Sequence, residues 1–229
     1  MKRSESKEFQ NICDSLQIPL PQNSLEKFEL YLEELGRWNK KINLISRKSD
    51  KPQDIYKHIL DSLLIFKAIG IPKEAFLLDI GSGAGFPGVP IKIVRDDIYL
   101  TLLESKRKKA FFLEQILKLL SLKKVEVINQ RLEELLRNTK FVEKYDIVTV
   151  KGVGDLKKII SLSLPFLKKG GLFVAYKGGK GEEELASLPL SSDYKIEKDL
   201  LFNIPEFNLS RWLLVISRCC ALKKFVKRK

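Results

Sequence analysis

Two acidic residues and a cluster of glycines have the types and the spacing to do chemistry. Asp79 lies in a short apolar run that stops at Gly81 and Gly83, and Glu104 ends a second apolar run further along the chain. Glycine lets the backbone take positive φ and lets a ligand approach the main chain closely. The free amide groups of such a turn could cradle a nucleotide. A carboxylate at the end of the second run could accept hydrogen bonds from both hydroxyls of a ribose.

Two ligand classes use this layout. The run from Gly83 to Gly88 matches the G-x-G-x-x-G pattern of dinucleotide binding, as in a nicotinamide-dependent oxidoreductase. Asp79 argues against that class, because a carboxylate at the strand end would repel a pyrophosphate and attract a cation. The stretch from Asp79 to Gly85 instead has the form of the first motif of methyltransferases that use S-adenosylmethionine, whose methionine end carries an ammonium and a sulfonium group. A turn that binds no ligand is the third reading, and the acids at both strand ends disfavour it.

A doubly wound sheet would bring these residues together. Alternating strand and helix patterns are typical of a mostly parallel, Rossmann-like α/β fold. The last part of the chain predicts a closing pair that adds one antiparallel strand near the C-terminus. The predicted strands are residues 76–80, 99–103, 125–128, 145–150 and 172–177, the closing pair is 194–201 and 212–220, and the predicted helices between strands are 89–94, 105–120 and 157–167.

The residues before this sheet predict an N-terminal helical extension, with helices at 24–38 and 54–69. Gly70 and Pro72 mark its end. We therefore divide the chain into three parts, which are the helical extension (1–72), the Rossmann-like methyltransferase domain (73–222) and a basic C-terminal tail (223–229).

The extension contains two further candidates for chemistry. His58 is the only histidine, and Asp61 follows it by one helical turn, so the pair could act as a general base or could simply be packed and hydrogen-bonded. The stretch 38–46 combines Trp38 with two asparagines and several cations, so it could contact RNA or could form a capped turn. The sequence leaves both alternatives open.

Composition limits the class of protein. The 229 residues are 44% hydrophobic, which suits one α/β domain with an appendage, and no run approaches the ~18 apolar residues of a membrane span. The polar start lacks the apolar core of a signal peptide. Three cysteines give neither a disulfide framework nor metal-ligand spacing. We expect a cytoplasmic protein without a metal site or a membrane partner.

The charge points to a polyanionic partner. The formal net charge is +13, and most of the excess follows residue 72. Lys106, Arg107, Lys108 and Lys109 open a predicted helix, where cations oppose the helix macrodipole. Such a placement suggests contact with phosphates, so these four residues are the candidate RNA-binding site. A basic RNA-binding module without enzymatic activity is the alternative, and the glycine turn disfavours it.

Four motifs together resemble one family, the bacterial glucose-inhibited division protein B or small-subunit ribosomal RNA methyltransferase G. They are the stretches 38–44, 58–62, 79–90 and 130–134. The resemblance implies that S-adenosylmethionine is the cofactor and that the methyl group goes to N7 of one guanine in 16S ribosomal RNA. It also implies cofactor contacts at Gly81, Phe86, Leu132 and Glu133, and it places Lys108 and Lys109 on the family's basic pair. The implied partner is 16S ribosomal RNA or an assembling small subunit, and we expect a monomer.

One position departs from the family pattern. The family has a Ser-Arg-Ala run after the fourth strand, where this chain has Val150, Lys151 and Gly152. Lysine keeps the charge but lacks the planar, forked guanidinium group. Lys151 is still a candidate cofactor contact and the one candidate for a catalytic role. Guanine N7 carries a lone pair and no proton, so positioning of the two reactants could suffice, and we assign no general base.

Overall fold

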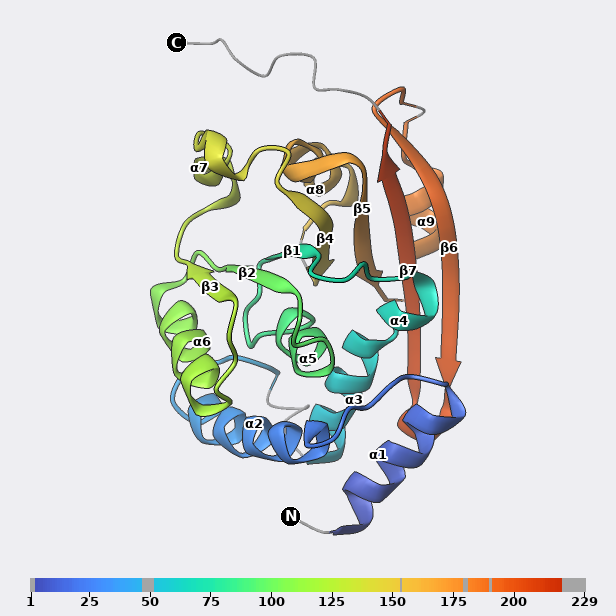
Figure 1. Ribbon diagram of the computed structural model, residues 1–229. Helices are drawn as coiled ribbons and strands as arrows, with labels where there is room; N and C mark the ends of the chain where they lie inside the picture. The colour runs from blue at the N-terminus through green and yellow to red at the C-terminus, as the bar shows by residue number, and fades with distance from the viewer. Residues whose placement is uncertain (1–2, 47–51, 153, 179–180, 190, 220–229) are drawn as a thin grey trace.

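A seven-stranded sheet lies between two layers of helices in the computed structural model, which describes residues 3–46, 52–152, 154–178, 181–189 and 191–219 (Figure 1). Its strand order is β3-β2-β1-β4-β5-β7-β6. The strands are β1 (Phe76–Ile80), β2 (Tyr99–Leu103), β3 (Val125–Ile128), β4 (Tyr145–Lys151), β5 (Leu167–Lys177), β6 (Tyr194–Ile204) and β7 (Leu209–Arg218).

The strand directions confirm the predicted doubly wound sheet. All pairings among β1 to β5 are parallel, whereas β7 is antiparallel to both β5 and β6. The chain moves outward from β1 through β2 to β3 and then returns to β4 on the other side of β1. Ligands of open α/β sheets bind outside the carboxyl ends of the strands at such a reversal. The reversal here lies between β1 and β4.

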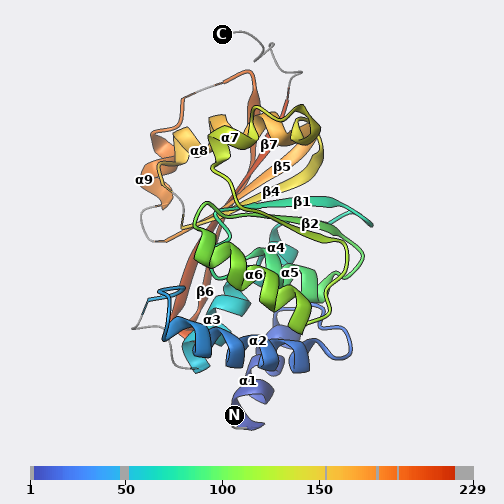
Figure 2. The same cartoon turned by 90° about the vertical axis from the view of Figure 1, so that its left-hand side faces the viewer.

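Helices cover the two faces of the sheet unequally. The first face packs against α1 (Arg3–Ser15), α2 (Ser24–Asn39), α3 (Pro52–Leu63), α4 (Ile65–Ala68), α5 (Gly88–Val94) and α6 (Arg107–Leu119). The second face packs against α7 (Leu132–Leu135), α8 (Leu156–Ser163) and α9 (Gly181–Ala186), with short 3₁₀ turns at Thr139–Phe141 and Leu164–Phe166. A third 3₁₀ turn, Pro205–Phe207, packs on the first face through Phe207. Figure 2 shows the two layers on either side of the sheet.

Alternation along the strands explains why both faces are buried. Leu77 belongs to the core of the first face and Leu78 to that of the second, and Leu213 and Leu214 divide in the same way. Successive side chains of a strand point to opposite faces, so a strand that is covered on both sides reads as a continuous apolar run. The N-terminal helices thereby share one core with the sheet. The division of the chain at residue 72 stays a prediction.

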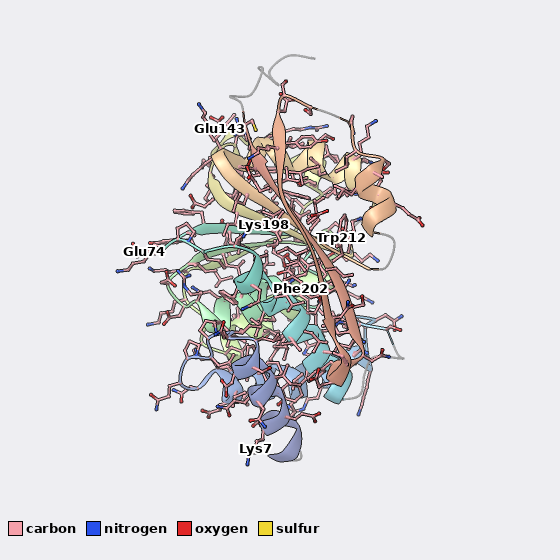
Figure 3. All side chains as sticks on the ribbon, turned by 90° about the vertical axis from the view of Figure 1, so that its right-hand side faces the viewer. Lys7, Glu74, Glu143, Lys198, Phe202 and Trp212 are labelled. Atoms are coloured by element: carbon pink, nitrogen blue, oxygen red, sulfur yellow. The ribbon has the colours of Figure 1, made fainter. Side chains whose placement is uncertain are left out.

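The edge of the sheet is formed by a long ribbon of β6 and β7 (Figure 3). Trp212 on β7 is buried, whereas most of β6 is exposed. Lys198 on β6 reaches back to the end of α4, where its Nζ donates to the Ala68 carbonyl at 2.7 Å. The ribbon is therefore fastened to the N-terminal helices as well as to β5.

Several element boundaries differ from the sequence prediction. Helix α1 was not predicted, and the single helix predicted at 54–69 is divided into α3 and α4 around Leu64. The helix predicted at 157–167 ends at Ser163, because a 3₁₀ turn containing Pro165 follows it. The predicted tail 223–229 and the loop residues 179–180 lie outside the described residues.

None of the helices in the described ranges is long and apolar enough to span a bilayer. Cys13 is buried among the N-terminal helices, where burial raises the pKa of its thiol to about 12. A thiol of this kind stays protonated at neutral pH and acts as a small apolar side chain.

Candidate active site

A pocket of about 360 Å³ opens beyond the carboxyl ends of β1 and β2 and extends to α7 and α8. Its volume lies within the ~300–1,000 Å³ of small-molecule sites. It brings together three of the predicted cofactor residues, Gly81, Leu132 and Glu133. The remaining lining residues are Ile80, Leu103, Ser105, Gln130, Arg131, Gly154, Asp155, Lys158, Ile159 and Leu162.

Glu104 fastens the glycine turn beside this pocket. One carboxylate oxygen accepts from the Gly83 amide at 2.9 Å and the other accepts from the Lys106 amide at 2.7 Å. The Glu104 carbonyl in turn accepts from the Asn129 side chain at 2.7 Å. Each carboxylate oxygen can accept more than one hydrogen bond. Glu104 can therefore hold the turn and the start of α6 while it accepts a ligand hydroxyl.

Positive φ angles shape the turn. Gly81 has φ of 72° and Gly83 has φ of 56°, which lie in a region that residues other than glycine rarely adopt. The amides of Gly81 and Ser82 both donate to the Leu103 carbonyl, at 2.8 and 3.1 Å. These bonds tie the turn to the end of β2, so the backbone that faces the pocket is held in one conformation.

Asp79 lies beneath the turn and away from the pocket surface. Its side chain is fully buried, with one oxygen accepting from the Thr149 hydroxyl at 3.0 Å and the other from the Gly88 amide at 3.3 Å. Burial raises the pKa of this carboxyl to about 6, although the hydrogen bonds from Thr149, Ser82 and Gly88 act in the opposite direction. From the sequence, we expect Asp79 to attract a cation directly. The structure instead shows it joining β1, β4 and α5, and its contact with a cofactor stays a prediction.

Phe86 lies in a second group of side chains, contributed by the N-terminal helices. Its ring centroid is 5.3 Å from that of His58 and 5.5 Å from that of Tyr31. The Tyr31 hydroxyl is buried and donates to the Ala84 carbonyl. Helices α2 and α3 thus position the distal half of the glycine turn.

Lys151, at the end of β4, joins the Phe86 group through a buried ion-pair network. Its Nζ lies 2.8 Å from Asp61 Oδ2 and 5.2 Å from the centre of the Phe86 ring. The other Asp61 oxygen pairs with Arg211 Nε at 2.7 Å. Asp61 is almost fully buried, and burial lowers the pKa of Lys151 despite the attraction of Asp61. One carboxylate therefore connects α3, β4 and β7.

His58 is neutral in this environment. Burial first, and then the charge of Lys151, lower its pKa to about 4, while Asp61 acts in the opposite direction. A ring with this pKa is a weak base at neutral pH. Of the two alternatives left by the sequence, the structure supports a packed histidine against Phe86.

The basic residues at the start of α6 lie on the same rim as Glu104. Lys106, Arg107 and Lys108 are exposed and Lys109 is half-buried. The first turn of α6 contains no acidic residue, and no ion pair within the described residues involves these four cations. Their charge is therefore available to a partner.

The predicted site residues thus form two groups with a support beneath them. Gly81, Leu132 and Glu133 line the pocket. Gly83 and Glu104 do not line it, but they are bonded to each other and Glu104 lies between the lining residues Leu103 and Ser105. Phe86 and Lys151 lie together on the other side of the turn. Within the described ranges, no three His, Cys, Asp or Glu side chains gather where they could share a metal ion.

Sequence reasoning missed three side chains that hold this arrangement, which are Tyr31, Thr149 and Arg211. Each acts on a partner more than 50 residues away in the chain, at Ala84, Asp79 and Asp61 respectively. Local spacing carries no signal for such pairs. Of the partners, Asp79 and Asp61 were singled out, Asp61 only as a neighbour of His58.

Comparison with known proteins identifies similar chains. A family model described as GidB, rRNA small subunit methyltransferase G, matches residues 24–209. A protein from Lachnoclostridium phytofermentans named ribosomal RNA small subunit methyltransferase G is 37% identical over 207 residues, which cover 89% of this chain and 85% of that protein. A protein of the same name from Clostridium botulinum is 35% identical over 224 residues, with coverage of 96% and 93%.

The fold is also similar to solved structures. A mutant of MtNAS in complex with S-adenosylmethionine has a TM-score of 0.58 and 13% sequence identity, covering 93% of this chain and 84% of that chain. At this identity the likeness concerns the fold alone.

Proposed function

The chain belongs to the rRNA small subunit methyltransferase G family, and from this premise we propose that it methylates N7 of one guanine in 16S ribosomal RNA. It is a methyltransferase of small-subunit ribosomal RNA and takes its methyl group from S-adenosylmethionine. The acceptor atom and the nucleotide are our proposal. The cofactor part of the proposal is supported most by the hydrogen bond from the Gly83 amide to the Glu104 carboxylate beside the pocket.

The residues around the pocket fit the adenosine part of S-adenosylmethionine. Glu104 offers carboxylate oxygens for ribose hydroxyls, and the Gly81 turn lets a ligand approach the backbone closely. Leu103, Leu132 and Ile159 supply apolar walls for a base. We propose that Gly81, Gly83, Glu104, Leu132 and Glu133 hold this part of the cofactor.

The Phe86 group would position the reacting end. When bound, the cofactor supplies an electrophilic sulfonium methyl group. Phe86 offers an aromatic face that attracts cations, and Lys151 closes the same side with its ammonium held by Asp61. Guanine N7 has no proton to remove, so a weakly basic His58 is no obstacle to the reaction. We propose that these residues act by orienting the reactants, which can contribute up to about 7–11 kcal/mol in well-aligned cases.

We also propose how the protein meets its substrate. Lys106, Arg107, Lys108 and Lys109 would contact phosphates of 16S ribosomal RNA, either free or in an assembling small subunit in the cytoplasm. The exposed edge strand β6 carries alternating charges at Lys195, Glu197 and Lys198, which disfavour pairing with a second copy. A monomer is therefore the proposed state.

Two measurements test the proposal. Isothermal titration should show micromolar binding of S-adenosylhomocysteine and none of NAD, and the reverse preference would exclude the cofactor assignment. Purified protein should then be incubated with S-adenosylmethionine and small subunits that lack the modification. Mass spectrometry of the digested RNA should detect 7-methylguanosine, and a different methylated nucleoside would show that the acceptor atom is wrong.

A further inference from the structure

A surface patch between α2 and α6 combines cations with two aromatic rings. We call it the α2–α6 patch. Figure 2 shows its two helices side by side, with α6 between α2 and the sheet. The cations are all exposed. The patch consists of Trp38, Lys40 and Lys41 at the end of α2 and of Arg107, Lys108 and Phe111 on α6.

The aromatic pair of the patch, Trp38 and Phe111, is held in place by packing yet partly exposed to solvent. Phe111 is 50% exposed, whereas its neighbour Phe112 is fully buried and fills the core. The Trp38 ring lies 5.8 Å from the Phe111 ring and 5.7 Å from the Phe112 ring, and its Nε1 donates to Glu34 at 2.7 Å. Core packing therefore accounts for Phe112 and Trp38 but leaves one side of Phe111 open.

The cations around this aromatic pair are free of ion pairs with any residue that the structure describes. No ion pair among the described residues involves Lys40, Lys41, Arg107 or Lys108. The neighbouring acids of α2, at positions 33 and 34, are both paired with Arg37. Cations at the start of α6 also oppose the helix macrodipole. The patch gains no internal stability from these charges, so they favour a polyanionic ligand.

An unpaired RNA nucleotide matches both features of the patch. Proteins bind single-stranded RNA by stacking splayed bases on aromatic rings while cations contact the backbone. A double helix would offer phosphates to the lysines but would leave Phe111 in water. On the α-helical rise of ~1.5 Å per residue, Phe111 lies about 6 Å along α6 from Arg107. Phosphate contacts and a stacked base can thus belong to neighbouring nucleotides.

We propose that Phe111, backed by Trp38, is a stacking platform for an unpaired base of the RNA substrate, outside the methyl-transfer site. Lys40 and Lys41 hold the backbone on one side of the stacked base, and Arg107 and Lys108 hold it on the other. The platform starts from the rim of the cofactor pocket, because the Lys106 amide is bonded to Glu104. The inference rests on the proposed function for the identity of the RNA, though not for the stacking itself.

The test compares Phe111→Ala with Phe111→Trp and with Leu119→Ala. Leu119 is the matched control, since it is 45% exposed on the same helix and lies outside the patch. The probe is a short fluorescein-labelled single-stranded oligoribonucleotide, titrated at several salt concentrations and repeated with the same strand in a duplex. Phe111→Leu serves as a second variant without a ring if Phe111→Ala lowers the melting temperature.

Phe111→Ala should weaken binding of the single strand by about 5- to 100-fold, as expected for loss of one stacked base. Its salt slope and its affinity for the duplex should not change, and Phe111→Trp and Leu119→Ala should bind like wild type. Lys40→Ala with Lys41→Ala should instead flatten the salt slope by about 1.4, the value for two phosphate contacts with a single strand.

Two results would overturn the platform. One is wild-type affinity of Phe111→Ala for the single strand. The other is that Phe111→Ala weakens binding to small ribosomal subunits but binds the single strand and the duplex like wild type. That result would make the patch a contact for a ribosomal protein. Methylation by the wild-type protein is measured in parallel. Stacking without methylation would refute the proposed function alone, and methylation without stacking would refute the platform alone.

Discussion

At the scale of single residues, Asp61 is a buried carboxylate that pairs with two cations. It is 1% exposed and faces both Lys151 and Arg211 at ion-pair distance. Removing one member of a buried ionic group leaves the remaining charges without compensation, which costs more than the group contributes when intact. The position of Lys151 over Phe86 therefore depends on Asp61.

Asp61→Asn should lower the free energy of unfolding by about 3–5 kcal/mol, because two cations would lose the carboxylate that they share. Urea denaturation measures this change. Glu184→Gln is the control, since Glu184 pairs with Lys177 at 2.6 Å but is partly exposed. A partly exposed pair of this kind should lose no more than about 1 kcal/mol. Equal losses in the two variants would show that the Asp61 network is not effectively buried.

Lys151→Arg tests the position at which the resemblance implies an arginine. The Lys151 side chain is 12% exposed and confined between Asp61 and the Phe86 ring, so a larger guanidinium must displace one of them. We expect single-turnover methylation to slow about tenfold, or ~1.4 kcal/mol, within the usual cost of overpacking. Lys151→Ala should slow it further. Wild-type rates for both variants would show that Lys151 has no part in the site.

Asp79 makes stability depend on pH in a predictable direction. Folding raises its pKa from 3.8 to about 6, so the folded chain binds this proton more tightly than the unfolded chain does. The stability that the proton provides is complete below about pH 4 and is lost as pH rises through about 6.

The stability of wild type minus that of Asp79→Asn should therefore fall by roughly 2–2.5 kcal/mol between pH 4 and pH 7, following a shift of about two pKa units. Urea midpoints at several pH values measure it. The comparison with Asp79→Asn is needed because the lowered pKa of His58 acts in the opposite direction in the same window. A difference that does not change with pH would mean that Asp79 is already ionised at pH 4.

At the scale of elements, the turn between β1 and α5 leaves room for glycine alone at Gly88. A Cβ at this position would lie 2.7 Å from Leu102 Cδ2 and 2.9 Å from Asp79 Oδ2. The close approach lets the Gly88 amide reach the Asp79 carboxylate. The glycine thus joins the start of α5 to β1.

Gly88→Ala should cost about 1–3 kcal/mol of stability, the usual cost of overpacking, and should weaken binding of S-adenosylhomocysteine because the turn must shift. Gly36→Ala is the control, because no atom lies within 4 Å of the added Cβ in the interior of α2. That change should stabilise the protein by roughly 0.5–1 kcal/mol. If Gly88→Ala changed neither the stability nor the affinity for S-adenosylhomocysteine, α5 would be free to shift without cost to either.

The sequence predicts β1 to β4 well, because each is a short apolar run that ends at a glycine, an acid or a turn. It starts β5 at residue 172, whereas that strand begins at Leu167. It fails for α1, where Phe9, Ile12 and Cys13 have helical spacing but only three apolar residues appear in a polar segment. It also stops β6 too early. That strand is mostly exposed, so its last residues show no clear alternation.

The candidate site, like the fold, can be predicted from the sequence only in part. Glu104 and the glycine turn are predictable because their functions depend on adjacent residues and on the order of the strands. The pairing of Asp61 with Arg211 joins residues 150 positions apart, so it depends on tertiary packing and is invisible to local patterns. The buried position of Asp79 has the same cause, since Thr149 reaches it from the neighbouring strand.

At the scale of the whole molecule, the N-terminal helices belong to the site as well as to the core. Tyr31 on α2 and both His58 and Asp61 on α3 surround Phe86 and Lys151. The α2–α6 patch extends the same side of the molecule outward. The first face of the sheet thus supports the Phe86 group, which we propose positions the reacting end of the cofactor, while the second face supports the pocket beside α7 and α8.

The charge of the whole chain leads to the last prediction. A net charge of +13 could attract RNA without any specific contact, or the cations at the start of α6 could make defined contacts with phosphates. Lys108→Ala with Lys109→Ala separates the two cases, when compared with Lys73→Ala plus Lys123→Ala. Lys73 and Lys123 are exposed and precede β1 and β3, so they lie at the amino ends of the strands. The start of α6 lies beyond the carboxyl ends.

Both double variants remove the same charge. If the contacts are defined, only the Lys108 and Lys109 variant should flatten the salt dependence of RNA binding, by about 1.4 for two contacts with a single strand. Its affinity for S-adenosylhomocysteine should stay within twofold of wild type, because neither side chain lines the pocket. Fluorescence anisotropy at several salt concentrations gives the slopes. Equal flattening in the two variants would mean that the protein attracts RNA through its overall charge, and loss of cofactor binding would mean that the start of α6 supports the pocket.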